Sequence, residues 1–394
     1  MLFDVTRLAS ILIEGKIPTG VDRVSLAYLR HYRAQSRALI RHWQRWVTPG
    51  QIQSQRIFSA LLGESPTPVA TIKHIVARGH LRLPRMARHE ILFNTGHSGL
   101  DHTGYIRRVR RYGLRPFYFL HDLIPINYPE YCRAGEAGLH RQRLLTMLKT
   151  GRGLIANSTD TADALHDYAR TQGLAAPPLL VAPVGTARLP PPGAIPTQAA
   201  GRPYFVVIGT IEPRKNHLLL LQVWRRLVEV CLRANLPEQD IPLLVIIGRR
   251  GWDCDHVFHQ IDRNPFLQGH VLEQPGCDDA RLSSWLCHAR ALLFPSFVEG
   301  FGMPLEEALA HGVPVIASDL PVFHEMAGDV PDYLDPLDGP AWLAMIKDYS
   351  QPDSPARAAQ IARMEGFTAP DWALHFTLVD DFLQRLGGQV DHAA

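Results

Sequence analysis

Short apolar runs, rich in β-branched and aromatic residues, alternate along this chain with longer amphipathic stretches. Strands joined by helices in this rhythm form βαβ units, and hence a parallel sheet. Ligands of such sheets bind beyond the carboxyl ends of the strands, so chemistry is expected in the loops that follow these runs. The sequence therefore predicts an α/β fold with strands at Ile91–Phe93, Phe117–Leu120, Leu154–Ala156, Leu179–Val181, Tyr204–Ile208, Leu243–Ile247, Ala291–Phe294 and Val313–Ala317.

The length of 394 residues and one stretch of unusual composition indicate two domains. Domains commonly hold about 100 to 200 residues. Residues 183–203 are rich in Pro, Gly and Ala and lack a sustained apolar period, which is typical of a linker. We therefore expect a first domain at 1–185, a Pro-rich linker at 186–202, a second domain at 203–370, and a C-terminal helix with a tail at 371–394.

The composition excludes several classes of protein. The chain is 46% hydrophobic and 20% charged, which excludes a disordered or fibrous protein. No apolar run approaches the ~18 residues that a membrane-spanning helix needs, and the start lacks the basic segment of a signal peptide. The five cysteines form no CxxC pair, so neither a disulfide framework nor a zinc site is indicated. The expectation is a cytoplasmic protein.

Charge is divided unevenly along the chain. Residues 1–200 carry 26 Lys and Arg against 12 Asp and Glu, whereas the remainder carries 15 against 26. A basic half attracts a phosphate-bearing ligand, an anionic membrane or nucleic acid, and charge alone does not choose among them. The basic stretches 41–46, 78–88 and 107–111 suit docking on anionic lipid headgroups, although scattered solvated arginines explain them equally well. No nucleic-acid recognition motif accompanies the charge, so nucleic acid is not an expected partner.

The sharpest motif covers residues 294–308, Phe-Pro-Ser-Phe-Val-Glu-Gly-Phe-Gly-Met-Pro-Leu-Glu-Glu-Ala. It places a glycine-bearing loop between a strand and a helix that is expected to begin near Pro304, because proline suits the first helical turn. Gly300 and Gly302 let the backbone approach a ligand closely, and the free amides and dipole of the new helix favour an anion such as a diphosphate. The loop is therefore a candidate phosphate site.

Two carboxylates, Glu299 and Glu307, bracket this loop with seven residues between them. A carboxylate accepts two hydrogen bonds from neighbouring hydroxyls, such as those of a ribose or a hexose. Beside a phosphate site, the pair therefore suggests a sugar nucleotide. A helix-start charge at Glu307 and a solvated Glu299 explain the spacing equally well.

A second motif, Gly-Thr-Ile-Glu-Pro-Arg-Lys-Asn-His at residues 209–217, follows another predicted strand. Its Arg214 and Lys215 suit the neutralisation of a leaving pyrophosphate, because Arg clamps phosphate oxygens bidentately and Lys adds a point charge. Together they replace a divalent metal, so no metal is expected. The alternative is a solvated charged turn.

Three loops of the basic half supply further candidates. His121 ends a predicted strand, although a lone histidine is more often structural. Gly20 and Arg23 lie in a loop that is otherwise an ordinary turn leading into a helix. His97 and Asp101 lie in a polar, glycine-containing loop that suits contact with an acceptor, although such loops are common without function.

The run from Glu299 to Glu307, Glu-Gly-Phe-Gly-Met-Pro-Leu-Glu-Glu, resembles the Glu-x7-Glu motif of family 4 glycosyltransferases, which are retaining enzymes of the GT-B fold. The segment His311–Ser318 is similar to the family's next segment, and the resemblance covers most of residues 203–330. It implies two Rossmann-like parallel-sheet domains facing a central cleft, an acceptor-side domain followed by a nucleotide-sugar donor domain. The C-terminal helix would cross back to the first domain.

The resemblance also implies roles for the residues of the two motifs. Glu299 would contact hydroxyls of the donor sugar, and Glu307 would hold the nucleotide ribose. Lys215 matches the family's lysine, whereas Thr210 stands where the family commonly has arginine, so that Arg214 would supply the guanidinium. The diphosphate would meet the backbone of Gly300, Phe301, Gly302, Met303 and Pro304.

In the first domain, His121 corresponds to a histidine that lies against the donor sugar in many family members. The stretch Pro18–Val24 resembles the family's first loop, Gly-Gly-x-x-Arg, with Thr19 in place of its first glycine and with Gly20 and Arg23 retained. We therefore expect His121, Glu299 and Lys215 to be catalytic.

The activity implied is a retaining, metal-independent hexosyl transfer without a cofactor, from a GDP- or UDP-linked sugar to a glycan or lipid-linked oligosaccharide. GDP-mannose is the leading donor, and surface polysaccharide assembly at the cytoplasmic face of the inner membrane is the implied setting, with peripheral association with anionic lipid. One alternative is a sugar-nucleotide epimerase or hydrolase of the same fold. The other is an inactive glycosyltransferase-like binding module, which would require losses at Glu299, Glu307 or Lys215, all of which are present.

Overall fold

The computed structural model describes residues 1–43, 45–81, 83–199 and 201–387, and the chain forms two compact units. The first unit holds Met1–Ile126, Gly135–Gly185 and the described residues from Pro370 onward, and the second holds Asn127–Ala134 and Thr186–Ala369. Each unit is built around its own β-sheet. The alternation of strands and helices predicted from the sequence is therefore confirmed in both halves.

The first unit contains a seven-stranded sheet in the order β3-β2-β1-β4-β5-β6-β7. The six strands β2, β1, β4, β5, β6 and β7 pair in parallel in that order. At the edge beside β2, strand β3 pairs with it in the antiparallel direction. Its elements are β1 (Leu2–Asp4), α1 (Thr6–Ile13), α2 (Gly20–Tyr32), β2 (Arg37–His42), β3 (Arg45–Val47), α3 (Gln51–Leu61), α4 (Pro68–Gly79), β4 (Ile91–Asn94), α5 (Thr103–Tyr112), β5 (Arg115–Leu120), α6 (Ile124–Asn127), α7 (Glu136–Thr150), β6 (Gly153–Ala156), α8 (Thr159–Thr171), β7 (Leu179–Val181) and α16 (Trp372–Arg385).

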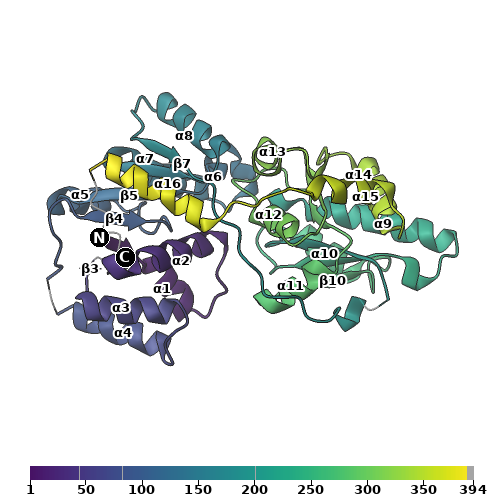
Figure 1. Ribbon diagram of the computed structural model, residues 1–394, viewed down its shortest axis with the longest axis horizontal. Helices are drawn as coiled ribbons and strands as arrows, with labels where there is room; N and C mark the ends of the chain where they lie inside the picture. The colour runs from purple at the N-terminus through teal and green to yellow at the C-terminus, as the bar shows by residue number, and fades with distance from the viewer. Residues whose placement is uncertain (44, 82, 200, 388–394) are drawn as a thin grey trace. The chain divides into compact units, whose positions relative to one another are not determined.

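Aromatic packing joins α16 to the rest of the first unit. The ring of Tyr28 in α2 contacts Phe119 of β5 and Phe376 of α16 edge-on, with centroids 5.8 and 5.2 Å apart. The buried Asp380 of α16 accepts a hydrogen bond of 2.7 Å from the hydroxyl of Tyr32. Figure 1 shows α16, in yellow, lying along this unit although it is the last helix of the chain. Burial of its apolar face therefore fixes α16 on the first unit.

The second unit contains a six-stranded sheet of parallel pairs in the order β10-β9-β8-β11-β12-β13. Its elements are β8 (Tyr204–Ile208), α9 (His217–Arg233), β9 (Leu243–Ile247), α10 (Asp255–Arg263), β10 (Val271–Glu273), α11 (Asp279–Cys287), β11 (Leu292–Phe294), α12 (Met303–Ala310), β12 (Val315–Ser318), α13 (Pro321–Ala327), β13 (Asp332–Leu334), α14 (Gly339–Ser350) and α15 (Pro355–Met364), with short 3-10 turns at Pro129–Tyr131, Thr197–Ala199, Pro213–Lys215 and Glu238–Asp240.

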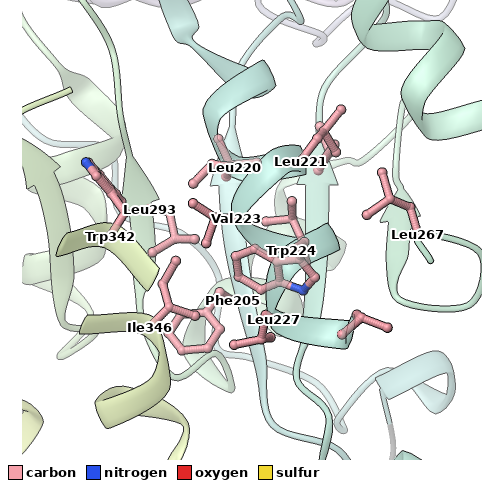
Figure 2. Close-up of a cluster of buried hydrophobic side chains, with 14 of the residues drawn as sticks. Phe205, Leu220, Leu221, Val223, Trp224, Leu227, Leu267, Leu293, Trp342 and Ile346 are labelled. Atoms are coloured by element: carbon pink, nitrogen blue, oxygen red, sulfur yellow. The ribbon is translucent and has the colours of Figure 1, made fainter. Parts of the chain in front are cut away.

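Strand residues of this sheet alternate between two apolar layers, as the period of two along a strand requires. Phe205 packs in one layer against α9 and α14, where Figure 2 shows Trp224 and Trp342 around it. Tyr204 packs in the other layer, against α11, with its ring edge-on to Trp285 at 5.4 Å. Because both faces are covered, the central strands β8, β9 and β11 are apolar throughout, which explains their clear signal in the sequence.

The Pro-rich segment expected as a linker packs against the second unit. Leu189 and Ala199 are buried in its core, and the carbonyl oxygen of Pro190 accepts a hydrogen bond of 2.6 Å from Ser283 in α11. The amide of Gly193 donates to Ser284 on the same helix. Side chains of α11 thus satisfy backbone groups of a segment that has few partners of its own.

Strand order reverses once in each sheet, at β1 and β4 in the first unit and at β8 and β11 in the second. At such a point the two loops that follow the strands lead in opposite directions and leave space beyond the carboxyl ends, which is where ligands of these sheets bind. The motif at 209–217 follows β8, and the motif at 294–308 spans the end of β11 and its loop. The topology therefore brings the two strongest sequence motifs together.

Candidate functional site

The loops after β8 and β11 are directly hydrogen-bonded to each other. The amide of Phe297 donates to the carbonyl oxygen of Arg214 at 2.8 Å, and the guanidinium Nη1 of Arg214 donates to the carbonyl oxygen of Val298 at 3.3 Å. This backbone contact holds the side chains of both motifs in one cluster.

Glu299 lies at the centre of that cluster and pairs with both predicted cations. Its Oε1 lies 2.6 Å from the ammonium of Lys215, and its Oε2 lies 2.5 Å from Nη1 of Arg214. Ser296 donates a further hydrogen bond to Oε1 at 2.7 Å. The second carboxylate, Glu212, accepts from Nε of Arg214 at 2.6 Å. The arrangement fixes Lys215 and Arg214 side by side at the carboxyl ends of β8 and β11.

Because the cluster is buried, the charges of Glu299, Lys215 and Arg214 strongly affect the pKa values of Glu299 and Lys215. Burial alone raises the pKa of Glu299, but attraction to Arg214 and Lys215 outweighs it and lowers the pKa to about 2. Burial lowers the pKa of the Lys215 ammonium, an effect that the carboxylate of Glu299 opposes. The ammonium also lies 4.6 Å from the centre of the Phe294 ring, which attracts a cation by its face. A charged triad is therefore maintained in a mostly buried position.

Gly302 shapes the start of α12. Its φ of 132° lies in a region that residues with a side chain rarely adopt, and a Cβ there would lie 2.8 Å from the ring of Phe323. That ring stacks on Phe294 with centroids 4.9 Å apart, so it is held in place. The helix begins at Met303, one residue before the expected Pro304. First-turn amides of a helix have no partner within the helix, and this one starts beside the triad, as an anion site requires.

Most of the remaining residues of the Glu-x7-Glu motif are also buried, and Met303 and Pro304 are half-buried. Gly300 and Phe301 lie in the loop, and Glu307 is 3% exposed in α12. Glu299 is 7% exposed, so the solvated position considered for it is not observed. The neighbouring Glu306, which sequence reasoning did not single out, is 1% exposed. Burial, together with the charge of Glu307, raises its pKa to about 8, and Thr186 donates to its Oε2 at 3.3 Å.

Comparison with known proteins interprets this geometry. Residues 195–330 match the family model described as "Glycosyl transferases group 1". This span is a group 1 glycosyltransferase domain. It contains both loops of the charged triad and the start of α12, so the resemblance seen in the sequence is confirmed.

Curated relatives of this chain include mannosyltransferases. The chain is 36% identical over 157 residues to O-antigen chain mannosyltransferase B of Escherichia coli, covering 40% of this chain and 39% of that protein. It is 47% identical over 161 residues to O-antigen chain mannosyltransferase RfbU of Salmonella typhimurium, covering 39% and 40%. The serotype-specific mannosyltransferase WbdA of Escherichia coli is 28% identical over 283 residues, or 66% of this chain and 34% of WbdA. The matched regions thus span less than half the length of these relatives.

Solved structures extend the likeness to the whole fold. Anabaena Alr3699/HepE in complex with UDP-glucose superposes with a TM-score of 0.63 at 14% identity, covering 97% of this chain and 99% of that one. At such low identity the likeness concerns the fold alone. The predicted fold class, GT-B with two parallel-sheet α/β domains, is confirmed.

The first unit brings three histidines together at the carboxyl ends of β4 and β5. The ring centroid of His97 lies 5.1 Å from that of His121 and 5.9 Å from that of His140. Nε2 of His97 faces the carbonyl oxygen of Phe119 at 2.7 Å, Nε2 of His121 that of Thr95 at 2.7 Å, and Nε2 of His140 that of Asp122 at 3.1 Å. Because a carbonyl oxygen only accepts, each Nε2 carries the proton and each Nδ1 is an acceptor.

Burial keeps these rings neutral. It lowers the pKa of His121 to about 4, and it lowers the pKa values of His97 and His140 as well. His121 is therefore an uncharged, hydrogen-bonding group at physiological pH. His97, expected to contact an acceptor, uses its Nε2 within the unit, and Asp101 is half-buried in the same loop before α5.

The loop before α2 is organised by a carboxylate that sequence reasoning passed over. The fully buried Asp22 accepts hydrogen bonds from the amide and hydroxyl of Thr19 at 2.8 and 2.6 Å, and pairs with Nε of Arg7 at 2.6 Å. Gly20 is the first residue of α2, and Arg23 is half-buried on its first turn. Thr19, which departs from the family's glycine, thus forms a capping box at the helix start.

Among the described residues, no group of three or more His, Cys, Asp or Glu side chains is arranged to hold a metal ion. Likewise, within the part of the chain that the structure describes, no helix combines the length and apolar character needed to cross a membrane.

Proposed function

We propose that this protein is a retaining, metal-independent glycosyltransferase that moves a hexose from a nucleotide-diphosphate sugar to a glycan or lipid-linked acceptor. The observation that carries the proposal is the triad of Glu299, Lys215 and Arg214 beside the start of α12, at the strand reversal of the glycosyltransferase domain.

The triad suits the departure of a diphosphate. Cleavage of a sugar–phosphate bond leaves negative charge on the diphosphate, which fixed donors and cations stabilise without reorganising. Lys215 supplies a compact charge, Arg214 supplies a planar fork, and the first amides of α12 supply uncharged donors. These groups do the work for which other transferases use a divalent metal.

The two motif glutamates complete the donor site in this proposal. Glu299 is ionised at all physiological pH values, because its pKa is lowered to about 2, so it can accept hydrogen bonds from sugar hydroxyls while it holds both cations in place. Glu307 would accept from the ribose. In the first unit, His121 would act as a neutral hydrogen-bonding group toward the donor sugar, with Nδ1 as its acceptor atom. Retention would follow if the leaving diphosphate accepts the proton of the acceptor hydroxyl on the same face.

Mannose from GDP-mannose is the leading donor, because the named relatives of the domain are mannosyltransferases. UDP-sugars are the second candidate, since HepE was solved with UDP-glucose. The relatives' names also favour O-antigen or related surface polysaccharide assembly as the setting. We place the protein in the cytoplasm, in peripheral contact with the inner membrane where lipid-linked acceptors lie.

The test is nucleotide release from a panel of GDP- and UDP-sugars in the presence of EDTA, with and without a bacterial membrane lipid extract. We expect release that requires both one donor and the extract. Lys215→Met and Glu299→Gln should each abolish it, whereas the surface change Glu365→Gln should not.

Three results would contradict the proposal. Release that does not depend on the extract would favour a hydrolase or epimerase. Release restored only by a divalent cation would exclude metal independence. Full turnover in Lys215→Met would remove the triad from the reaction.

A further inference from the structure

The edge of the first sheet carries a surface that the donor site does not use. Its apolar part is formed by Trp43, at the end of β2, and by Leu81 and Leu83, which follow α4. These side chains are 91%, 87% and 89% exposed. We call these three residues, with Arg45, Arg78, Arg85 and Arg88, the β3 edge surface.

Hydrogen bonds hold the two parts of this surface together. Nδ1 of His42 lies 2.6 Å from Nε2 of His80, and Arg45 donates to the carbonyl oxygen of His80 at 2.9 Å. At the other end of β3, the amide of Arg85 donates to the hydroxyl of Thr48 at 2.8 Å. The chain between residues 80 and 85 is therefore fastened at both ends along β3, and it presents Leu81 and Leu83 beside the tip that carries Trp43.

The exposure of these residues is unusual for a soluble surface. Large apolar side chains scattered singly are ordinary, but a group of them within one charged rim marks an interaction site. The ring of Trp43 stacks on the exposed ring of His42, with centroids 5.4 Å apart, and is 91% exposed. The fold gains little from an apolar residue in that position.

The rim is strongly basic. Residues 37–113 carry thirteen Lys and Arg against three acidic residues, Glu64, Glu90 and Asp101. Arg45, Arg78, Arg85 and Arg88 are exposed, and α5 adds exposed arginines at 107, 110 and 111. Helix α5 adjoins the same edge, because Arg108 lies 5.9 Å from the ring centre of Trp46 in β3. The charge of this rim therefore favours an anionic partner.

We propose that the β3 edge surface docks this protein on an anionic lipid bilayer. Trp43, Leu81 and Leu83 enter the interface between headgroups and acyl chains, where tryptophan is favoured, and the arginines contact lipid phosphates. The phosphates of a nucleic acid would contact the arginines, but a nucleic acid offers no apolar interior for the exposed leucines to enter. The inference rests on the proposed function in one respect, since it supplies the membrane contact that a lipid-linked acceptor requires.

The experiment is co-sedimentation of the full chain with phosphatidylcholine vesicles, with and without phosphatidylglycerol, in the absence of any sugar nucleotide. Two double variants separate the contributions, Leu81→Ser with Leu83→Ser for the apolar part and Arg85→Gln with Arg88→Gln for the charge. The control is Leu337→Ser, which removes a 77% exposed leucine from the second unit. Thermal unfolding of each variant tests that the fold is kept.

We expect the native chain and the control to bind only vesicles that contain phosphatidylglycerol. The arginine variant should bind about tenfold more weakly or worse, because it removes two cations from a surface that faces anionic lipid. The leucine variant should bind about tenfold more weakly or worse, because it removes the apolar side chains that enter the bilayer. High salt should weaken native binding in the same way.

Equal binding by the native chain and both double variants would overturn the inference, as would equal binding to vesicles without phosphatidylglycerol. A dimer in solution that the leucine variant dissociates would identify a second copy as the occupant instead. Because no donor is present, failure here leaves the proposed transfer reaction untouched. Conversely, vesicle binding without turnover on any donor would contradict only the proposed function.

Discussion

Replacing Glu299 by glutamine tests whether the triad is held together by charge. The substitution keeps the size of the side chain and an oxygen for Ser296, but it leaves Lys215 and Arg214 without the carboxylate that pairs with both. Arg214 retains its ion pair with Glu212, whereas Lys215 loses its direct ion pair and keeps the face of the Phe294 ring and the more distant charge of Glu212. We therefore expect this nearly isosteric substitution to lower the free energy of unfolding substantially.

The magnitude follows from the pKa of Glu299. Its ordinary value is 4.5 and its value in the folded protein is about 2, a difference that corresponds to about 3 kcal/mol at pH 7. The side chain is 7% exposed, so solvent screening reduces this little. Because the pKa is lowered in the folded state, the stabilisation is complete above pH 4.5 and is lost as the pH falls through about 2.

Urea unfolding of the native chain and Glu299→Gln at pH 7 and pH 3 measures the effect. We expect the variant to be less stable by about 3 kcal/mol at pH 7 and by about half of that at pH 3, where the native carboxylate has lost part of its advantage. The exposed Glu365→Gln should change stability by less than about 0.5 kcal/mol at both values. A penalty that is small at pH 7, or equal at the two pH values, would refute the assignment of a charged triad.

Three further predictions concern the same domain. Lys215→Met should lower kcat by roughly a hundredfold or more, because it removes a fixed cation from the leaving group, and steady-state kinetics would show whether KM changes instead. Gly302→Ala should weaken donor binding and lower the melting temperature more than Gly312→Ala does, since both have positive φ but only Gly302 would meet a neighbouring ring, and calorimetry measures both effects. Glu306→Gln should stabilise the protein by roughly 4 kcal/mol at pH 9 and by little at pH 4.5. The reason is that the raised pKa of Glu306, about 8, makes the stability of the native protein fall as the pH rises from 4.5 to 8. Urea unfolding midpoints of the variant and the native protein that differ equally at the two pH values would contradict this prediction.

The sequence allowed the architecture and the centre of the site to be predicted because both leave strong local signals. Strands buried on two faces are apolar throughout, so runs such as Tyr204–Ile208 and Leu243–Ile247 stand out and occur as predicted. The three-residue strands β7 and β11 are wholly apolar and were predicted, whereas β10 and β13 each contain an acidic residue and were missed. Their place in the sheet is set by their neighbours.

Partners within the site were harder to predict than the motifs themselves. Glu212 lies inside the recognised motif, and its charge next to Arg214 was the available signal, yet only the fold shows that it binds that arginine. Ser296 and Asp22 are polar residues of ordinary loops until their partners are known. Glu306 reads as a helix-surface carboxylate, and its burial follows from the packing of the segment that carries Thr186. Long-range burial and pairing are properties of the fold and leave no local pattern.

Segment boundaries show the same limit. Asn127–Ala134 lies among strands of the first unit in the sequence but belongs to the second unit, where the ring of Tyr131 stacks on Phe297 at 5.5 Å. Trp252 also donates to the carbonyl oxygen of Tyr131 at 3.3 Å. An excursion of eight residues has no composition that would distinguish it from a loop.

The central claim is that the Glu299, Lys215 and Arg214 cluster transfers a sugar without a metal. The measurement that tests it most directly is the transfer of labelled hexose from GDP-mannose, and from the other sugars of the panel, into the lipid extract by EDTA-treated native protein and by Lys215→Met. The account predicts labelled acceptor with the native protein from one donor and none above background with a folded Lys215→Met variant. Labelled acceptor in equal amounts from both proteins would contradict it.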